Sequence, residues 1–265
     1  MIARGFARFS AGIAAVLLAG CVTTHSNGRV VDQKEAARAN TQLGVAYLRQ
    51  GNMAQAKEKL ERAEKQDPRS HEVQYALALF SERMNQPADA DRHYQSALKL
   101  SANNAEVSNA YAVFLCRSNK IDQALRLFDE VVKNQLYNAP WVAATNAAIC
   151  LRSEKRNADA VPWLERAIAQ RPDYYPAVVE LGDLHIENNE PQKARVAVDR
   201  YLSIGRKSGD VLVVGVRAAV AQGDRAAADI YARLLRRDFP NTPAANALPQ
   251  LLQGPTAPST APRQP

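Results

Sequence analysis

The sequence predicts an all-α protein built as a solenoid of repeated helical hairpins, and three observations support this fold class. Alanine recurs at an almost constant interval, with steps of 34, 34, 36, 34 and 34 residues between aligned positions. The aligned residues are Ala56, Ala90, Ala124, Ala160, Ala194 and Ala228. A small residue twelve positions before each alanine and a large one four positions after it recur with the same period. The chain is also rich in alanine and only 6% aromatic, which favours closely packed helices.

A period of 34 residues is the signature of the tetratricopeptide repeat (TPR). The segment Leu43–Tyr47 reads Leu-Gly-Val-Ala-Tyr and matches the core of its first helix. We therefore predict six repeats over 37–245, and thus twelve helices, which by resemblance to TPR proteins wind into a right-handed superhelix. The predicted repeats cover 37–70, 71–104, 105–140, 141–174, 175–208 and 209–245. The alternative, a helical bundle with accidental alanine spacing, leaves the other periodic positions unexplained.

Each periodic position has a physical role. The small residues, Gly44, Ala78, Ala112, Ala148, Gly182 and Val216, let the two helices of one repeat approach closely. The large residues, Leu60, Tyr94, Phe128, Leu164 and Val198, fill the space beside the next repeat, although the sixth repeat has Ala232 there. Closing prolines at Pro68, Pro172 and Pro240 end second helices. The two extra residues lie near Tyr137–Pro140, and the sixth repeat departs most, with Gly215 where leucine is usual.

Residues 1–20 have the pattern of a targeting segment. Arg4 and Arg8 precede an apolar run that is too short to span a bilayer. The run ends in Leu-Ala-Gly-Cys at residues 18–21, which resembles the lipobox of bacterial lipoproteins and predicts a covalent lipid on Cys21. Val22 after the cysteine resembles the outer-membrane sorting pattern. The alternative is an ordinary secretory signal with Cys21 incidental.

Both ends of the mature chain lack apolar periodicity. Residues 21–36 are predicted to be the lipidated cysteine and a flexible tether. Residues 246–265 are predicted to be a disordered tail, because four prolines with Gly, Ser and Thr after residue 253 cannot bury a core.

Cys116 and Cys150 remain once Cys21 carries lipid. They lie 34 residues apart, late in the first helices of neighbouring repeats, in a compartment that favours oxidation. A disulfide is therefore geometrically plausible, although the insertion shifts the register by about half a turn. Two buried free thiols are the alternative.

Enzyme, metal and nucleic-acid chemistry find no support in the pattern. The four histidines are scattered without metal-ligand spacing, and no nucleotide or nucleophile motif is present. The formal charge of +7, which falls to +5 when Arg4 and Arg8 are removed, has no clustered basic stripe with aromatic support. We therefore predict no catalytic residue, no metal, no cofactor besides the lipid, no small-molecule substrate and no nucleic acid.

In TPR proteins the first helices of successive repeats line a groove. Carrying those positions over predicts an apolar channel with a basic rim, in which Arg49, Arg83 and Arg117 recur at 34-residue steps. The predicted partner-binding residues are Arg49, Tyr75, Leu79, Arg83, Asn109, Val113, Arg117, Asn146, Ile149 and Arg152. Such a channel suits an amphipathic helix or an extended segment that carries acids. The alternative for each residue is a solvated surface charge or a core side chain.

Two segments narrow the family. Residues 104–116 contain Asn109, Tyr111 and a Phe-Leu-Cys run at 114–116. Residues 136–150 contain Leu-Tyr, a proline and Asn-Ala-Ala-Ile-Cys. Both resemble segments of the type IV pilus biogenesis and stability lipoproteins, the PilF/PilW family or TPR-type pilotins, with alanine at 112 and 148 where the family has glycine.

This resemblance implies an outer-membrane lipoprotein on the periplasmic face that binds the pilus secretin or another assembly subunit. It would support secretin targeting, oligomerisation or stability. Asn109 and Asn146 are the candidates for hydrogen bonds to a partner backbone, with bonds inside the solenoid as the alternative. Two other classes of function stay open: a general scaffold for envelope assembly unrelated to pili, and a regulator of a cell-wall enzyme.

Overall fold

The computed structural model describes residues 32–101 and 104–253, and these residues form helices and turns without a strand. The predictions for residues 1–31, including lipid on Cys21, and for 254–265 fall outside the described residues. Twelve helices of 13 to 17 residues follow one another in pairs. They are α1 (Gln33–Arg49), α2 (Met53–Gln66), α3 (His71–Arg83), α4 (Pro87–Leu100), α5 (Ala105–Arg117), α6 (Ile121–Lys133), α7 (Pro140–Ser153), α8 (Asn157–Gln170), α9 (Tyr175–Glu187), α10 (Pro191–Ser203), α11 (Gly209–Ala221) and α12 (Arg225–Asp238). The predicted all-helical TPR array is confirmed.

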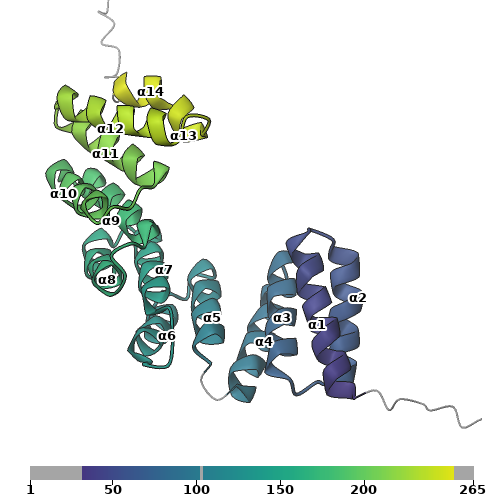
Figure 1. Cartoon of the computed structure of the whole chain (residues 1–265). Helices are drawn as coiled ribbons and strands as arrows, with labels where there is room; N and C mark the ends of the chain where they lie inside the picture. The colour runs from purple at the N-terminus through teal and green to yellow at the C-terminus, as the bar shows by residue number, and fades with distance from the viewer. Residues whose placement is uncertain (1–31, 102–103, 254–265) are drawn as a thin grey trace, which may run out of the picture.

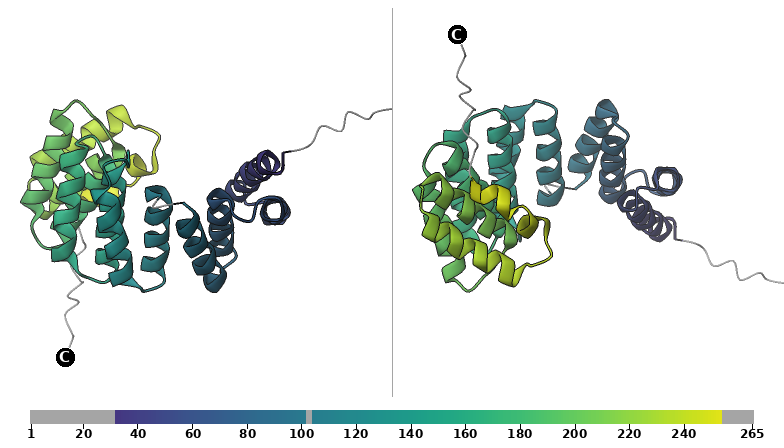
Figure 2. Two further views of the ribbon diagram at one scale, coloured as in Figure 1. Left: turned by 90° about the horizontal axis from the view of Figure 1, so that it is seen from below. Right: turned by 90° about the horizontal axis from the view of Figure 1, so that it is seen from above.

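The pairs stack in series, from α1 and α2 at one end to α11 and α12 at the other (Figure 1). Figure 2 shows the same stack from below and from above, with the purple first pair and the green and yellow last pairs at opposite ends. Each first helix packs on the second helix of its own repeat. First helices also pack on one another in the pairs α1–α3, α5–α7, α7–α9 and α9–α11, whereas α5 packs on the repeat before it through α4. The first helices therefore form one packed row from α5 to α11 and a packed pair, α1 and α3, before it.

One left-handed residue turns the chain between the two helices of every repeat. A positive φ is found at Gly51, Asn85, Asn119, Lys155, Asn189 and Gly223, at the same steps of 34, 34, 36, 34 and 34 residues as the alanines. Glycine and asparagine tolerate this conformation at little cost. Lys155 occupies it in the fourth repeat, which is the turn with the weakest sequence signal.

The periodic small residues lie where the two helices of a repeat touch. A Cβ atom on Gly44 would lie 2.5 Å from Leu60 Cδ2, so only glycine fits without a shift. Gly215 departs from the usual leucine because the ring of Tyr231 fills that space, 2.9 Å from the position of a Cβ atom. The atypical residue of the sixth repeat is therefore a packing requirement.

The chain continues as helix after α12, which differs from the tail expected from residue 246. Two short helices, α13 (Pro243–Asn246) and α14 (Leu248–Gln253), follow, and the side chain of Leu248 is 0% exposed. Pro243 lies 34 residues after Gly209, so α13 and α14 occupy the place of the first helix of a seventh repeat. Because α11 would otherwise expose its apolar face, the half-repeat caps the core.

Candidate partner-binding groove

The C-terminal halves of α1, α3 and α5 line a groove of about 790 Å³. Its apolar walls come from one or two residues of each first helix, and its charged residues come from the ends of the same helices. The lining residues are Val45, Leu48, Arg49, Leu79, Glu82, Arg83, Asn85, Gln86, Pro87, Phe114, Arg117 and Ser118. The groove therefore joins three repeats, with the α3–α4 turn closing one side.

The three periodic arginines, Arg49, Arg83 and Arg117, all line this groove. Arg117 Nη1 lies 3.5 Å from Glu82 Oε2, and the Arg117 side chain is 73% exposed while that of Glu82 is 18% exposed. Among the described residues, Arg49 and Arg83 have no carboxylate within 4.0 Å. The mouth of the groove is therefore basic, and its single acid lies deeper.

A cluster of four aromatic side chains from α3, α4 and α5 lies next to the groove. Tyr94 lies at the centre, with its ring centroid 5.3 Å from Tyr111, 5.4 Å from Phe114 and 6.1 Å from Tyr75. The Tyr94 hydroxyl donates to Glu82, which holds this carboxylate toward the arginines. The sequence predicted Tyr75 as a groove residue and Tyr94 as core. The sequence did not predict that the rings of Tyr75 and Tyr94 are in contact, because α3, α4 and α5 come together only when the repeats stack.

Burial raises the pKa of three tyrosine hydroxyls in this cluster. It raises the pKa of Tyr75 to about 12, with the carboxylates of Glu106 and Glu82 adding to the shift. It raises the pKa of Tyr111 to about 12 as well, where the hydroxyl donates to Asp91 Oδ1 at 2.8 Å. Burial raises the pKa of Tyr94 further, together with its bond to Glu82. All three hydroxyls are protonated at neutral pH, and those of Tyr94 and Tyr111 donate hydrogen bonds to carboxylates.

Two links join α5 to α7 at the middle of the solenoid. Asn146 Nδ2 donates to Asn109 Oδ1 at 3.2 Å, so the two asparagines predicted to meet a partner meet each other. About two turns further along α5 and one turn further along α7, Cys116 and Cys150 form a disulfide with their Cα atoms 5.8 Å apart. The Asn109 amide nitrogen and the Asn146 carbonyl oxygen have no side-chain partner among the described residues.

The remaining predicted groove residues divide into two groups. Val113 is half-buried against the central core, and Ile149 is 45% exposed. Arg152, by contrast, is held within the chain: Nη1 donates to Glu180, and Nη2 lies 2.6 Å from Glu187 Oε1. Beyond α5, therefore, the predicted basic groove residue Arg152 is engaged in ion pairs within the chain. In that half the groove cations pair with acids of a neighbouring first helix, Arg152 with acids of α9 that follows it and Arg217 with Asp183 of α9 that precedes it, at 2.5 Å.

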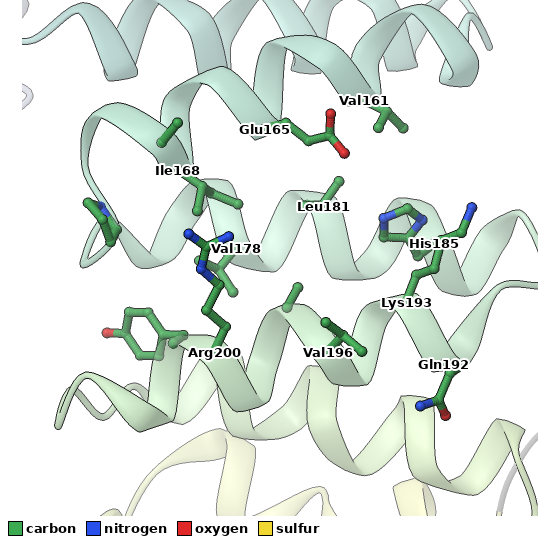
Figure 3. A pocket seen from close by; sticks show the side chains of 14 residues that line it. Val161, Glu165, Ile168, Val178, Leu181, His185, Gln192, Lys193, Val196 and Arg200 are labelled. Carbon is green, nitrogen blue, oxygen red and sulfur yellow. The ribbon is translucent and has the colours of Figure 1, made fainter.

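A second hollow lies on the opposite, second-helix side, between α8 and α10, with α9 as its floor (Figure 3). It measures about 500 Å³ and is lined mainly by apolar side chains, including Val161, Ile168, Leu181 and Val196. Glu165 lies on the α8 wall and Arg200 on the α10 wall. Sequence reasoning missed it, although outward-facing valines on two second helices are a signal for such a surface.

Within the described residues, no group of three or more His, Cys, Asp or Glu side chains could hold a metal ion. No helix of the described part combines the length and apolar content needed to cross a bilayer.

This helical architecture defines a TPR protein, and family models agree. Models described as tetratricopeptide repeat match residues 37–80, 83–144, 115–175 and 151–212. Yeast Tom70, at 20% identity and a TM-score of 0.58 over 78% of this chain and 43% of its own, shares the fold.

Two relatives identify the family of TPR proteins to which this chain belongs. The type IV pilus assembly protein PilF of Pseudomonas aeruginosa is 30% identical over 231 residues, 86% of this chain and 92% of the relative. Its solved structure gives a TM-score of 0.63 at 28% identity, covering 82% of this chain and 98% of that one. PilW, a type IV pilus biogenesis factor, gives 0.64 at 27% identity, covering 80% and 97%. The chain belongs to the PilF/PilW family of type IV pilus assembly TPR proteins, which are non-enzymatic scaffolds.

Proposed function

We propose that this protein is an outer-membrane lipoprotein that acts as a pilotin, binding the type IV pilus secretin through the groove of α1, α3 and α5. The observation that carries the proposal is the row of Arg49, Arg83 and Arg117 at the mouth of an apolar groove shared by three repeats. Apolar walls bury one face of a bound segment, and the arginines select a segment that carries acids.

The mechanism is mass action. A groove that holds the secretin subunit favours the state of that subunit that is competent to assemble, by the free energy of binding. The lipid on Cys21 supplies the membrane affinity, since several acyl chains on one residue make a stable anchor. The groove and the lipid thus have separate roles, and the tether of residues 21–36 connects them.

The test compares two charge reversals in cells. The variant Arg83→Glu with Arg117→Glu places like charges opposite an acidic segment. We expect it to reduce secretin multimers and twitching motility by about tenfold or more. The control is Arg62→Glu with Arg126→Glu, two exposed arginines on second helices, which makes the same change in net charge. Equal secretin multimers in the two strains, with both proteins folded, would contradict the groove.

The general scaffold for envelope assembly is the second candidate function. It predicts normal pili and a normal secretin ring in a deletion strain, together with altered outer-membrane protein content. A deletion strain that keeps both pili and multimers would therefore rule out the pilotin.

A further inference from the structure

The outer face of α12 carries an apolar side chain surrounded by arginines. Ile230 is 50% exposed, Leu234 is half-buried beside it, and Arg233, Arg236 and Arg237 are exposed around them. These five residues line a shallow hollow of about 570 Å³ that involves no other element. We refer to them as the α12 basic face.

The fold itself does not require this arrangement. The inward side of α12, with Ala228, Tyr231 and Leu235, already fills the core of the last repeats. Arg233 and Arg236 have no carboxylate within 4.0 Å among the described residues, while Arg237 pairs with Asp238 at 2.7 Å. Two cations and a large aliphatic side chain thus face solvent without a structural role.

We propose that the α12 basic face docks on a bilayer surface that contains anionic phospholipids. Arginine suits this ligand because its planar guanidinium binds phosphate oxygens through two parallel hydrogen bonds. An exposed isoleucine between such cations is typical of a helix that lies in the headgroup region, with its apolar side chain entering the acyl boundary.

The shape of the surface favours a bilayer over an acidic peptide. The hollows at α1–α3–α5 and at α8–α10 are walled by several helices and suit a polypeptide segment. The α12 basic face is the outer surface of a single helix, which a planar headgroup layer can meet without a wall on either side. A peptide would gain little buried area there.

Because α12 lies near the C-terminal end of the solenoid, its contact with a membrane would determine how the solenoid is oriented. The inference rests on the proposed function for its biological setting, because the lipid on Cys21 places a bilayer at the N-terminal end. α1 and α12 lie at opposite ends of the stack (Figure 1). Attachment at both ends would lay the solenoid along the membrane, whereas the lipid alone would let it pivot about the tether.

The experiment uses the mature chain with Cys21→Ser, so that no acyl chain contributes. Vesicles of phosphatidylethanolamine with phosphatidylglycerol are compared by flotation with vesicles of neutral lipid, at about 0.15 M salt. We expect binding to the anionic vesicles only. The variant Arg233→Gln, Arg236→Gln, Arg237→Gln should bind about a hundredfold less, since each arginine near such a surface contributes roughly fivefold. Ile230→Ser should lose a further factor of about three to ten.

The matched control is Arg62→Gln, Arg69→Gln, Arg126→Gln, which removes three exposed arginines from other elements. Undiminished vesicle binding by the α12 variant, an equal loss in the control, or equal binding to neutral vesicles would each overturn the proposal. If the triple variant does not fold by circular dichroism, Arg233→Gln with Arg236→Gln avoids the ion-paired Arg237. Its expected loss is about 25-fold. Because lipidation and secretin are absent from the assay, failure of the pilotin function would leave this result unchanged.

Discussion

Cys116 on α5 and Cys150 on α7 form a disulfide that joins two successive first helices, with their Cα atoms 5.8 Å apart. Cys116 occupies the twelfth position of the third predicted repeat, and Cys150 occupies the tenth position of the fourth. The two-residue insertion before α7 therefore does not separate the sulfur atoms. The insertion changes which turn of α7 packs against α5.

We predict that this bond stabilises the centre of the solenoid. Closing a loop of 34 residues lowers the entropy of the unfolded chain and contributes about 3 to 4 kcal/mol. The variant Cys116→Ala with Cys150→Ala should therefore unfold at a lower temperature than the oxidised protein. Mass spectrometry of the unreduced protein isolated from cells should find one bond. Two free thiols in that protein would contradict the prediction.

A second prediction concerns His93 on α4. Its imidazole is buried, with Nδ1 2.8 Å from Gln74 Oε1. Burial lowers its pKa, and nearby Arg92 lowers it further, against the opposing effects of Glu64 and Asp89. Because the folded-state pKa lies below the unfolded value near 6.5, this residue stabilises the fold above that pH, and the stabilisation is lost as the pH falls through the folded pKa.

Thermal unfolding at about pH 7.5 and about pH 5 measures this difference. We expect the melting temperature of the parent protein to fall more than that of His93→Gln, which has no imidazole to charge. The melting temperature of His71→Gln, a change at a more exposed histidine, should fall as much as that of the parent protein. A pH response in His93→Gln as large as in the parent would show that His93 makes no contribution.

A third prediction concerns Gly215 on α11. A Cβ atom there would lie 2.9 Å from Tyr231 Cγ, so Gly215→Ala should destabilise the last repeats by about 1 to 3 kcal/mol. The control is Gly209→Ala at the start of the same helix, where the nearest atom would be 3.6 Å away. That change should be neutral or stabilising by up to about 1 kcal/mol. Urea unfolding decides between them, and equal midpoints would contradict the steric reason.

A fourth prediction tests the cap formed by α14. Leu248→Ala removes a fully buried side chain and should cost about 2 to 5 kcal/mol, with the loss confined to the last repeats. Leu136→Ala is the control, because that leucine is 94% exposed on the loop between α6 and α7. Hydrogen exchange should show faster exchange in α11 and α12 for the first variant only. Unchanged exchange would mean that the half-repeat does not protect the core.

Local features carried most of the predictable information. The periodic alanines, the small residues of the first helices and the closing prolines each act within a few residues of themselves, so repeated copies revealed the helical pairs directly. The arginine row could also be predicted, because Arg49, Arg83 and Arg117 share one position in three regular repeats. Arg152 could not, since its partners Glu180 and Glu187 lie on the next first helix.

The sequence by itself determined the class of fold, the family and the periodic positions, because the residues that a repeat requires recur at the same positions in successive copies. Only the tertiary structure decided that Asn109 bonds to Asn146, that Tyr94 holds Glu82 beneath the arginines, and that Leu248 is core. Those outcomes depend on how far each repeat rotates against its neighbour. That rotation is set by side-chain packing between repeats and has no local signature in the chain.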